Sequence, residues 1–224
     1  MAESTVRSAL TPERIVRAAV DVVDQEGLDA LTMRRLGAEV GFEAMSLYRH
    51  FESKAALLDA VLADLLGQLE LPALGADWRA DLREGCRRYR RLLLEHPNAV
   101  SLFARLELGN PSAVRAAGWV MAVLRGAGRD AETALQVLST LQSYVIGFAF
   151  WEVGTAPLRA DPRFAGPRRP VQLPRDADPY LAALLPQFAG TSCDESFEFG
   201  LDVMIRGIDR GAAEESPASV ATPG

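Results

Sequence analysis

Signals for helix starts and stops recur along the chain and constrain its fold more than any other feature of the sequence. Thr11-Pro12-Glu13 combines a capping hydroxyl, a proline suited to the first helical position and an acid in the first turn. Apolar residues then recur at helical spacing until Gly27. No segment shows the convincing alternation of apolar and polar residues that a strand needs. The sequence therefore predicts an all-α fold.

The first part of the chain is expected to contain four helices. After the helix that ends at Gly27, three more are marked by caps, glycines or leucines at helical spacing: one between Thr32 and Gly41, one from about Glu43 to His50, and one that Ser53 caps. Residues 67–75, which include Pro72, follow as a joint. We therefore expect a first domain over residues 1–68.

A larger helical domain is expected over residues 76–213. Its helices are marked by four signals: Asp77 before a helix to Glu95, Asn110-Pro111 before a helix to about Arg125, Asp130 before a long helix to about Val153, and the capping-box spacing of Ser192 and Glu195. The helix after Asp77 carries an apolar stripe of Leu82, Cys86, Tyr89 and Leu93. Residues 154–176 hold five prolines and predict an irregular loop. Residues 214–224, rich in serine, proline and alanine, are expected to be disordered.

Residues 32–51 have the organisation of a helix-turn-helix, in which one helix braces a second that enters the major groove of DNA. Leu36 and Val40 on the first helix, with Leu47 and Phe51 on the second, can close a small core where the helices cross. Short helices separated by a glycine are also common in all-α proteins with other functions. The pattern alone therefore leaves both explanations open.

The outward face of the second helix suits DNA. Burial of its apolar face leaves six residues to point outward: Ala44, Met45, Ser46, Tyr48, Arg49 and His50. Ala44 and Met45 would be unusual on a solvated surface but suit contact with thymine methyl groups. Tyr48 and Ser46 can donate to phosphate, and Lys54 adds charge where the backbone amides of the next helix already favour an anion.

The block from Thr11 to about Asp59 resembles the DNA-binding domain of the tetracycline repressor family. The resemblance is carried by Glu26-Gly27, Leu31 to Leu36, Gly41 at the turn, Leu47 to Phe51, and Lys54 before Leu57-Leu58. Because several fixed spacings match together, the resemblance is far more specific than a generic helix-turn-helix. It implies a DNA-binding transcriptional regulator.

The resemblance implies a role for each matching residue. Tyr48, His50 and Lys54 would hold the phosphate backbone, and Thr32 would support the entry of the second helix. The residues nearest the bases would be Arg34, Ala44, Met45, Ser46 and Arg49.

Two positions depart from the family pattern. Gly37 stands where alanine is more common, which costs a little helix propensity. Glu43 stands where many members have a small residue. An acid there suits a helix N-terminus and can accept from cytosine, but it would repel a phosphate. The operator sequence therefore stays open.

Net charge alone does not exclude DNA as a partner. The chain carries a net charge of −6 and has a sequence pI of about 5.1, whereas phosphate contacts depend on lysine and arginine. Residues 1–68 are acidic as a whole, but residues 32–54 hold four basic side chains against three acidic ones. DNA binding is therefore expected to be confined to one small face.

For the second half of the chain, the resemblance implies a ligand cavity and a homodimer formed largely by the last two long helices. The sequence offers two apolar stripes for this interface: Leu135, Leu138, Leu141, Val145 and Phe148 on one helix, and Phe197, Leu201, Met204 and Ile208 on the other. The alternative is that both stripes serve only the core of a single chain.

Aromatic residues with a few polar neighbours are candidates for the ligand cavity: Phe103, Trp119, Gln142, Tyr144, Phe148 and Trp151. Taken singly, an aromatic residue at helical spacing more often belongs to a core. The two histidines, His50 and His96, are too few for a histidine-based metal-chelate site, and His96 beside Pro97 suits a capping role. We therefore expect a small apolar or aromatic effector, with no metal and no cofactor.

Two further motifs have competing explanations. Five arginines on one predicted helix raise a second nucleic-acid hypothesis: Arg83, Arg87, Arg88, Arg90 and Arg91. Most of them lie opposite the apolar stripe, which favours a solvated face, and the alternative is pairing with acids of a neighbouring helix. Residues 126–131 have the outline of a dinucleotide fingerprint, but they follow a predicted helix where that motif needs a strand.

The sequence favours a regulator over an enzyme. It holds no nucleophile elbow, paired metal-ligand motif or phosphate loop, and an all-α enzyme that uses carboxylates stays the alternative. Two cysteines are too few for a disulfide framework, and the longest apolar runs fall short of the roughly 18 residues that span a bilayer. We expect a cytoplasmic homodimeric repressor that binds a pseudo-palindromic operator in double-stranded DNA and leaves it when the effector binds.

Overall fold

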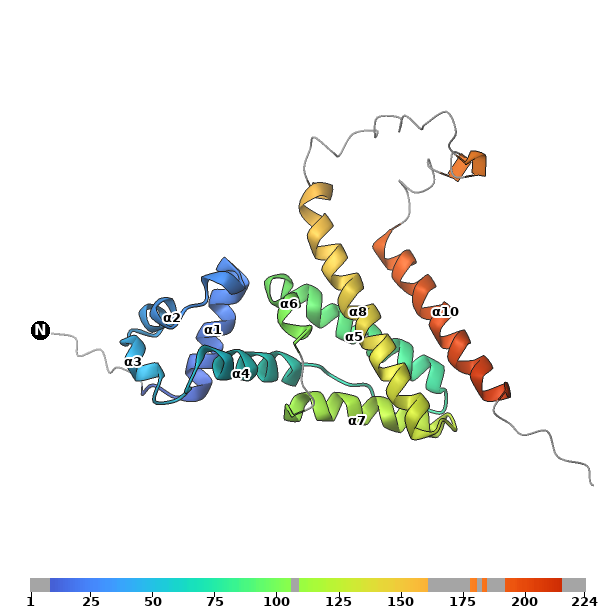
Figure 1. Cartoon of the computed structure of the whole chain (residues 1–224), viewed down its shortest axis with the longest axis horizontal. Helices are drawn as coiled ribbons and strands as arrows, with labels where there is room; N and C mark the ends of the chain where they lie inside the picture. The colour runs from blue at the N-terminus through green and yellow to red at the C-terminus, as the bar shows by residue number, and fades with distance from the viewer. Residues whose placement is uncertain (1–8, 106–108, 161–177, 181–182, 185–191, 215–224) are drawn as a thin grey trace, which may run out of the picture.

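The computed structural model describes residues 9–105, 109–160, 178–180, 183–184 and 192–214, and over these ranges the chain is helical without strands (Figure 1). The all-α prediction is confirmed. The elements, in chain order, are α1 (Pro12–Glu26), η1 (Leu28–Ala30), α2 (Met33–Val40), α3 (Ala44–Leu47), α4 (Lys54–Gly67), α5 (Trp78–Glu95), η2 (Pro97–Ala99), α6 (Val100–Phe103), α7 (Pro111–Gly126), α8 (Ala131–Ala160) and α10 (Cys193–Glu214).

Side-chain caps begin the helices where the sequence predicts them. Thr11 Oγ1 accepts a hydrogen bond from the backbone nitrogen of Arg14 at 3.3 Å. Ahead of α10, Ser192 Oγ accepts from the Glu195 nitrogen at 3.1 Å, and Glu195 Oε2 accepts from the Ser192 nitrogen at 3.0 Å. These bonds satisfy donors that the N-terminus of a helix otherwise leaves unpaired.

The third helix is shorter than predicted. The helix expected over residues 43–50 is the single turn α3, after which the Phe51 nitrogen donates to the Leu47 carbonyl oxygen at 3.0 Å. The chain turns here because Phe51 packs inward, and the backbone is extended at Ser53, the residue that caps α4.

Helix α8 is longer than predicted. It continues through residues 154–160, where the prolines predict a loop. Pro157 lies in its last turn, where a missing N–H removes only one hydrogen bond near the helix end. The rest of the predicted loop, 161–176, and most of the predicted disordered tail, 215–224, lie outside the described residues.

Helix α4 connects the two parts of the molecule (Figure 1). It packs against α1 on one side and against α6 and α7 on the other. Helices α5 and α7 both pack against α8, and α10 lies beside α8. The helix that follows the helix-turn-helix is therefore also part of the larger helical bundle.

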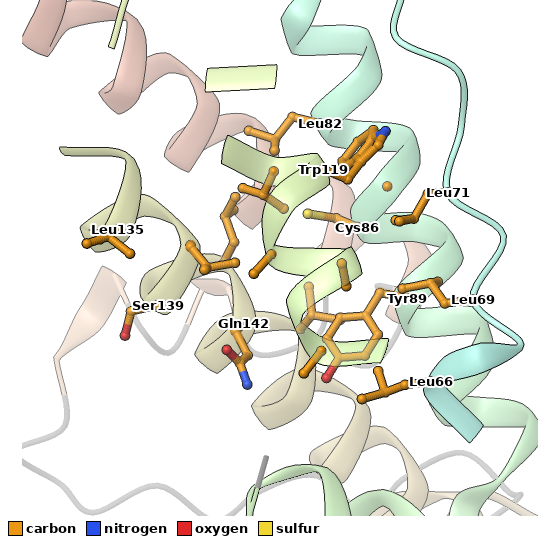
Figure 2. Close-up of a pocket in the computed structure, with 18 residues that line it drawn as sticks. Leu66, Leu69, Leu71, Leu82, Cys86, Tyr89, Trp119, Leu135, Ser139 and Gln142 are labelled. Atoms are coloured by element: carbon orange, nitrogen blue, oxygen red, sulfur yellow. The ribbon is translucent and has the colours of Figure 1, made fainter. Parts of the chain in front are cut away.

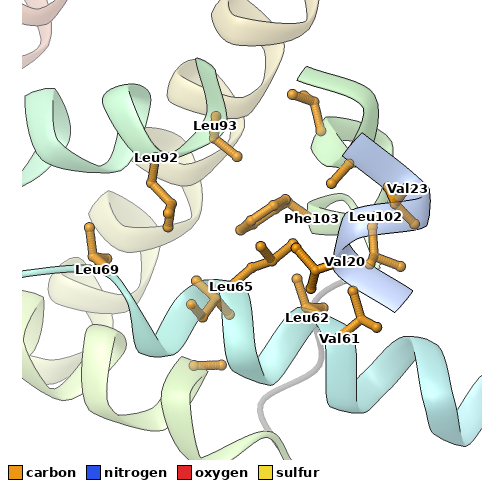
Figure 3. Close-up of a cluster of buried hydrophobic side chains, with 14 of the residues drawn as sticks. Val20, Val23, Val61, Leu62, Leu65, Leu69, Leu92, Leu93, Leu102 and Phe103 are labelled. Atoms are coloured by element: carbon orange, nitrogen blue, oxygen red, sulfur yellow. The ribbon is translucent and has the colours of Figure 1, made fainter. Parts of the chain in front are cut away.

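A shared apolar core fills the junction between these parts (Figure 3). It brings together Val20 of α1, Leu65 of α4, Leu93 of α5 and Phe103 of α6. Leu65, Leu93 and Phe103 are almost completely buried. Burying one such side chain stabilises a fold by roughly 1.5–3 kcal/mol. The helices before residue 68 therefore share their core with the helices that follow.

Residues Ala131–Ala156 of α8 are long and apolar enough, by length and composition alone, to cross a membrane. In the structure this helix packs against α5, α6 and α7 on one side and against α10 on another. Of the most apolar window of this helix, 22% is buried in the structure.

Candidate DNA-binding surface and ligand cavity

Helices α2 and α3 form the expected helix-turn-helix. The turn between them is left-handed at Gly41, with φ of 76° and ψ of 31°, a conformation that glycine adopts readily. Leu36 and Leu47 are fully buried, and Val40 is nearly so. Phe51 is partly buried and packs against the same core. The predicted core at the helix crossing is confirmed.

Gly37 has a steric role that sequence reasoning missed. A Cβ atom at this position would lie 2.7 Å from the Phe42 carbonyl oxygen and 3.2 Å from the Ala44 nitrogen. Both atoms belong to the backbone, which cannot move aside as a flexible side chain does. The expectation that Gly37 only costs helix propensity is therefore incomplete, because its missing side chain lets the turn approach α2.

Most of the predicted outward face is exposed. Met45 is 71% exposed and Tyr48 is 45% exposed. Arg49 and His50 are exposed as well. This face thus presents one large apolar side chain among groups that can bind phosphates or base edges, as the sequence predicts.

The other residues predicted to contact DNA differ in exposure. Arg34 and Lys54 are exposed in the first turns of α2 and α4. Thr32 caps α2 by accepting from a backbone nitrogen at 3.0 Å. Ser46 and Ala44 are half-buried because α3 packs against α2, and Ala44 also contacts the core. The sequence predicts that both residues face freely outward, and the structure leaves each of them only partly exposed.

Arg35 is engaged by acidic side chains. Its guanidinium lies 2.6 Å from the Glu26 carboxylate and 2.7 Å from that of Glu39. Hydrogen bonds to these two carboxylates raise the pKa of Arg35 above its usual value. The exposed basic side chains of this segment are Arg34, Arg49 and Lys54.

Arg14 joins α1 to the helix-turn-helix. Its Nη2 donates to the Val40 carbonyl oxygen at 2.9 Å, and its guanidinium lies 5.6 Å from the centre of the Phe42 ring. The bond satisfies a carbonyl at the C-terminal end of α2. Sequence reasoning missed this contact, because an arginine in the first turn of a helix carries no signal of its distant partner.

A cavity of about 300 Å³ lies among α4, α5, α7 and α8 (Figure 2). Its wall is mainly aliphatic and includes the indole of Trp119, whose Nε1 donates to the Pro72 carbonyl oxygen at 2.7 Å. A Cβ at Gly85 would lie 2.6 Å from this indole, so the glycine lets the ring lie against α5. Four polar or polarisable groups interrupt the apolar wall: Cys86, Tyr89, Ser139 and Gln142.

The hydroxyl of Tyr89 is left unsatisfied. It is buried and has no hydrogen-bond partner among the residues that the structure describes. Burial raises the pKa of Tyr89 and raises the pKa of Cys86 to about 12, so both groups are neutral at pH 7. The cavity is therefore apolar and uncharged along α5, and the buried Tyr89 hydroxyl is a polar atom without a hydrogen-bond partner in its wall.

Two of the six predicted ligand residues, Trp119 and Gln142, line the cavity. Phe103 does not, because it is fully buried in the core, with its ring centroid 6.1 Å from that of Tyr89. Sequence reasoning did not assign Tyr89 and Cys86 to the ligand site, although both belong to the apolar stripe predicted on this helix. Helical periodicity alone does not separate a cavity wall from a filled core.

The remaining three predicted ligand residues lie along α8, away from the cavity. Tyr144 and Phe148 pack against Phe197 of α10, with ring centroids 5.4 and 5.3 Å from it. The Tyr144 hydroxyl donates to the Phe197 carbonyl oxygen at 2.8 Å. Trp151 is half exposed. These aromatic residues join α8 to α10 and do not line this cavity.

Arginines of α5 pair with acids of α8 and α10. The pairs and their nitrogen–oxygen distances are Arg90–Glu152 at 2.8 Å, Arg87–Glu198 at 2.6 Å and Arg83–Asp202 at 3.0 Å. The alternative of pairing with neighbouring helices is confirmed at these positions; Arg83 and Arg90 are largely withdrawn from solvent, whereas Arg87 is paired and still exposed, as the predicted solvated face requires. Charges on α5 therefore hold α8 and α10 in place, which the sequence pattern of a single helix does not reveal.

An apolar face stays open on α8 and α10. Its large side chains are 50–72% exposed: Phe150, Trp151, Phe199 and Val203. Residues from the two predicted interface stripes are instead at most 4% exposed: Leu141, Val145, Phe197 and Leu201. Leu138 lines the cavity, and Leu135, which also borders it, is 55% exposed. The stripes therefore serve the interior of one chain in part, and the open face is formed mostly by other residues.

His96 joins the two parts of the molecule. Its Nδ1 lies 2.9 Å from the Asp24 carboxylate of α1, and Asn98 Nδ2 donates to the Asp24 carbonyl oxygen at 2.9 Å. His96 also occupies the position after the last residue of α5. Within the described part of the chain, no group of three or more His, Cys, Asp or Glu side chains is arranged to hold a metal ion.

The glycines of the predicted dinucleotide outline end a helix. Gly126 is the last residue of α7, and Gly128 has φ of 76° in the turn before α8. The segment therefore lacks the preceding strand that a dinucleotide fingerprint requires.

Two family models match the chain. One, described as bacterial regulatory proteins of the tetR family, matches residues 15–61. The other, described as the tetracyclin repressor-like C-terminal domain, matches residues 71–211. The first contains the helix-turn-helix, and the second contains most of the residues that line the cavity.

Two curated proteins are similar over different lengths. The tetracycline repressor protein class A from transposon 1721 of Escherichia coli is 30% identical over 202 residues, which cover 89% of this chain and 90% of that protein. An HTH-type transcriptional regulator of Saccharopolyspora erythraea is 35% identical over 146 residues, which cover 65% of this chain and 62% of that protein. The match thus spans less than two thirds of the second relative.

Solved structures of ActR from Streptomyces coelicolor share the fold. Apo ActR superposes with a TM-score of 0.82 at 31% identity, covering 93% of this chain and 99% of that one. ActR in complex with actinorhodin gives a TM-score of 0.80 at 32% identity, covering 92% and 99%. The helix-turn-helix and the helical bundle agree with these matches, which together cover nearly the whole chain. The chain therefore belongs to the tetracycline repressor family of transcriptional regulators.

Proposed function

We propose that two copies of this chain bind a pseudo-palindromic operator and repress transcription, and that a small apolar or aromatic molecule in the cavity releases them. One observation carries this proposal: α4 belongs to both sites. It begins at Lys54 beside the helix-turn-helix, and Leu66 near its end lines the cavity. Similarity to a tetracycline repressor, and to ActR in its complex with actinorhodin, supports the proposal.

In the proposed complex, exposed side chains around α3 contact DNA. Tyr48, His50 and Lys54 hold phosphates, while Thr32 fixes the start of α2 and so supports the placement of α3. The residues nearest the bases are Arg34, Ala44, Met45, Ser46 and Arg49. Two such surfaces about 34 Å apart in a dimer match successive major grooves.

Contacts between α7 and α4 provide a route from cavity to DNA. Arg115 Nη2 of α7 donates to the carbonyl oxygens of Leu66 and Leu69 at 3.1 and 3.2 Å. Ser112 Oγ donates to the Ala63 carbonyl oxygen at 3.0 Å. A ligand that displaces α7 therefore displaces the end of α4. Release from DNA then depends on how much better the ligand binds the displaced state.

The chemistry of the cavity defines the class of effector. Aliphatic walls and the Trp119 indole favour an apolar or aromatic body. The Tyr89 hydroxyl and the Gln142 amide favour at least one group that forms hydrogen bonds. Because Tyr89 and Cys86 are neutral at pH 7, an uncharged molecule fits this wall better than an ion.

The open apolar face of α8 and α10 is the proposed dimer interface. Phe150, Trp151, Phe199 and Val203 would be covered by the same helices of the second copy. Burying aromatic side chains is a common way to stabilise an obligate interface. In this dimer α8 would contact α5, α6 and α7 of its own chain on one side and the second copy on the other, which explains its high apolar content.

We infer that the regulator acts in the cytoplasm, where its operator lies, and catalyses no reaction. The relatives are named as transcriptional regulators or repressors. Of the described residues that line the cavity, none is a carboxylate or a histidine. The alternative of an all-α enzyme that uses carboxylates therefore has no support from the cavity.

Genomic footprinting followed by fluorescence anisotropy tests the proposal. The footprint identifies the operator, and we expect salt-sensitive binding of a dimer to it. A screen of small apolar compounds should find one that releases the DNA. Ala116→Phe, which fills the cavity, should keep DNA binding but lose the response. Absence of salt-sensitive binding to the footprinted sites would contradict the proposal.

A further inference from the structure

A second cavity lies between the N-terminal half of α8 and the C-terminal half of α10. Its volume is about 630 Å³, and among the described lining residues it shares only Leu141 with the first cavity. Its lining includes four apolar side chains, Val137, Leu141, Met204 and Ile208. Polar residues also line it, among them Arg129 from the turn between α7 and α8.

Arg129 is an unusual residue for such a cavity. It is 8% exposed, and among the described residues it is the only polar or charged residue in the buried class. Its Nε is buried and has no hydrogen-bond partner within the described part of the chain. The backbone holds it in place, because its nitrogen donates to the Leu124 carbonyl oxygen at 3.0 Å. A buried guanidinium nitrogen without a hydrogen-bond partner is costly, and an anion beside the guanidinium would help to balance its charge.

Two of the three nearby acids, Asp209 and Asp130, are engaged by other groups. The ion pair with Arg79 lowers the pKa of Asp209, and the charge of Arg129 lowers that pKa further without an ion pair between the two. Asp130 accepts hydrogen bonds from the first turn of α8 at 2.8 and 2.9 Å. Glu132 lines the cavity but is exposed. These three acids also disfavour a multiply charged anion, because they would repel it.

We propose that this cavity binds an organic monocarboxylate. The carboxylate would lie on the planar guanidinium of Arg129, which matches it with two parallel hydrogen bonds. The apolar body of the ligand would lie against Val137, Met204 and Ile208. The site is separate from the proposed effector cavity, and it does not depend on the effector hypothesis.

Calorimetric titration of the full-length protein with octanoate tests this site. We expect binding that is weakened at least tenfold by Arg129→Leu. Arg125→Leu is the matched control, because it removes an exposed arginine one turn earlier. It should leave octanoate binding unchanged, and so should Ala116→Phe in the first cavity. Octanol, which lacks the charge, and inorganic phosphate, which lacks the apolar body, should each bind at least tenfold more weakly.

Thermal unfolding and sedimentation give two further readouts, which test the proposal even if a variant is less stable than the original protein. Octanoate should raise the Tm of the original protein but not that of Arg129→Leu, whose own Tm should be equal or higher because a buried unpaired charge is gone. Undiminished octanoate binding by Arg129→Leu, or equally tight phosphate binding, overturns the proposal. Loss of binding in Ala116→Phe overturns it in favour of the first cavity. If Arg129→Leu has a lower Tm than the original protein and its dimer dissociates, the second copy of the chain is the partner of Arg129, and the proposal is overturned.

Discussion

Removing the hydroxyl of Tyr89 should stabilise the free protein. This oxygen is buried without a partner among the described residues, and an unsatisfied buried polar group costs about 1–3 kcal/mol. Phenylalanine keeps the ring and its edge contact with Phe103, so no packing is lost. At the lower end of that range, Tyr89→Phe should raise the free energy of unfolding by about 1 kcal/mol. For a chain of this length, that corresponds to about 2–4 °C in Tm.

Tyr144→Phe is the matched control. It makes the same chemical change in the same part of the molecule, but the Tyr144 hydroxyl donates to the Phe197 carbonyl oxygen at 2.8 Å. Its loss removes a hydrogen bond and should lower the free energy of unfolding by about 1 kcal/mol. Thermal unfolding followed by circular dichroism at pH 7, without ligand, compares both variants with the original protein.

Ligand binding should change in the opposite direction for Tyr89→Phe. A compound that releases the operator and bonds to this hydroxyl should bind about tenfold more weakly to the variant, since about 1.4 kcal/mol corresponds to that factor. Tyr144→Phe should leave its affinity unchanged. A lower Tm for ligand-free Tyr89→Phe than for the original protein would refute the reasoning, because the hydroxyl must then have a stabilising partner.

Four further substitutions test the DNA-binding surface and the dimer. Lys54→Ala should weaken binding to all DNA and reduce the salt slope by about 1, and an unchanged slope would contradict a phosphate contact. Arg34→Ala should relax sequence preference in a competition assay, whereas an equal loss across operator variants would place this residue on the backbone. Gly37→Ala should lower both operator affinity and Tm, because its Cβ would lie 2.7 Å from a backbone oxygen; an unchanged affinity would show that the turn can move freely. Phe199→Glu should give monomers in sedimentation with the helical content preserved, and a persisting dimer would exclude this face as the interface.

The local features of the fold could be predicted from the sequence. Thr11 and Ser53 cap the helices that they were expected to cap, and Thr32 caps the helix expected to start after it, because capping depends on residues three positions away. The helix-turn-helix followed from the same signals and from its fixed spacings. Its outward residues could be predicted because Leu36 and Leu47 determine which side of each short helix is buried.

The features that depend on neighbouring helices could not be predicted. Phe103 and Tyr89 have similar aromatic side chains, yet one is in the core and the other borders a cavity. Arg90 pairs with Glu152, 62 residues later in the chain, so its environment depends on how α5 and α8 pack. A pattern on one helix shows which face is apolar, but it does not show which element covers that face or whether it is filled.

The apolar junction at α4 has a consequence for how such regulators diversify. Leu65, Leu66 and Leu69 are buried, and the surfaces that cover them come from the helices on both sides of the junction. A gene fusion that joined residues 1–68 to an unrelated sensor would leave Leu65 and Leu66 exposed unless the new sensor reproduced the lost surface. Operator choice and effector choice are therefore inherited together. New pairings of the two should arise by substitutions within an intact chain rather than by exchange of its halves.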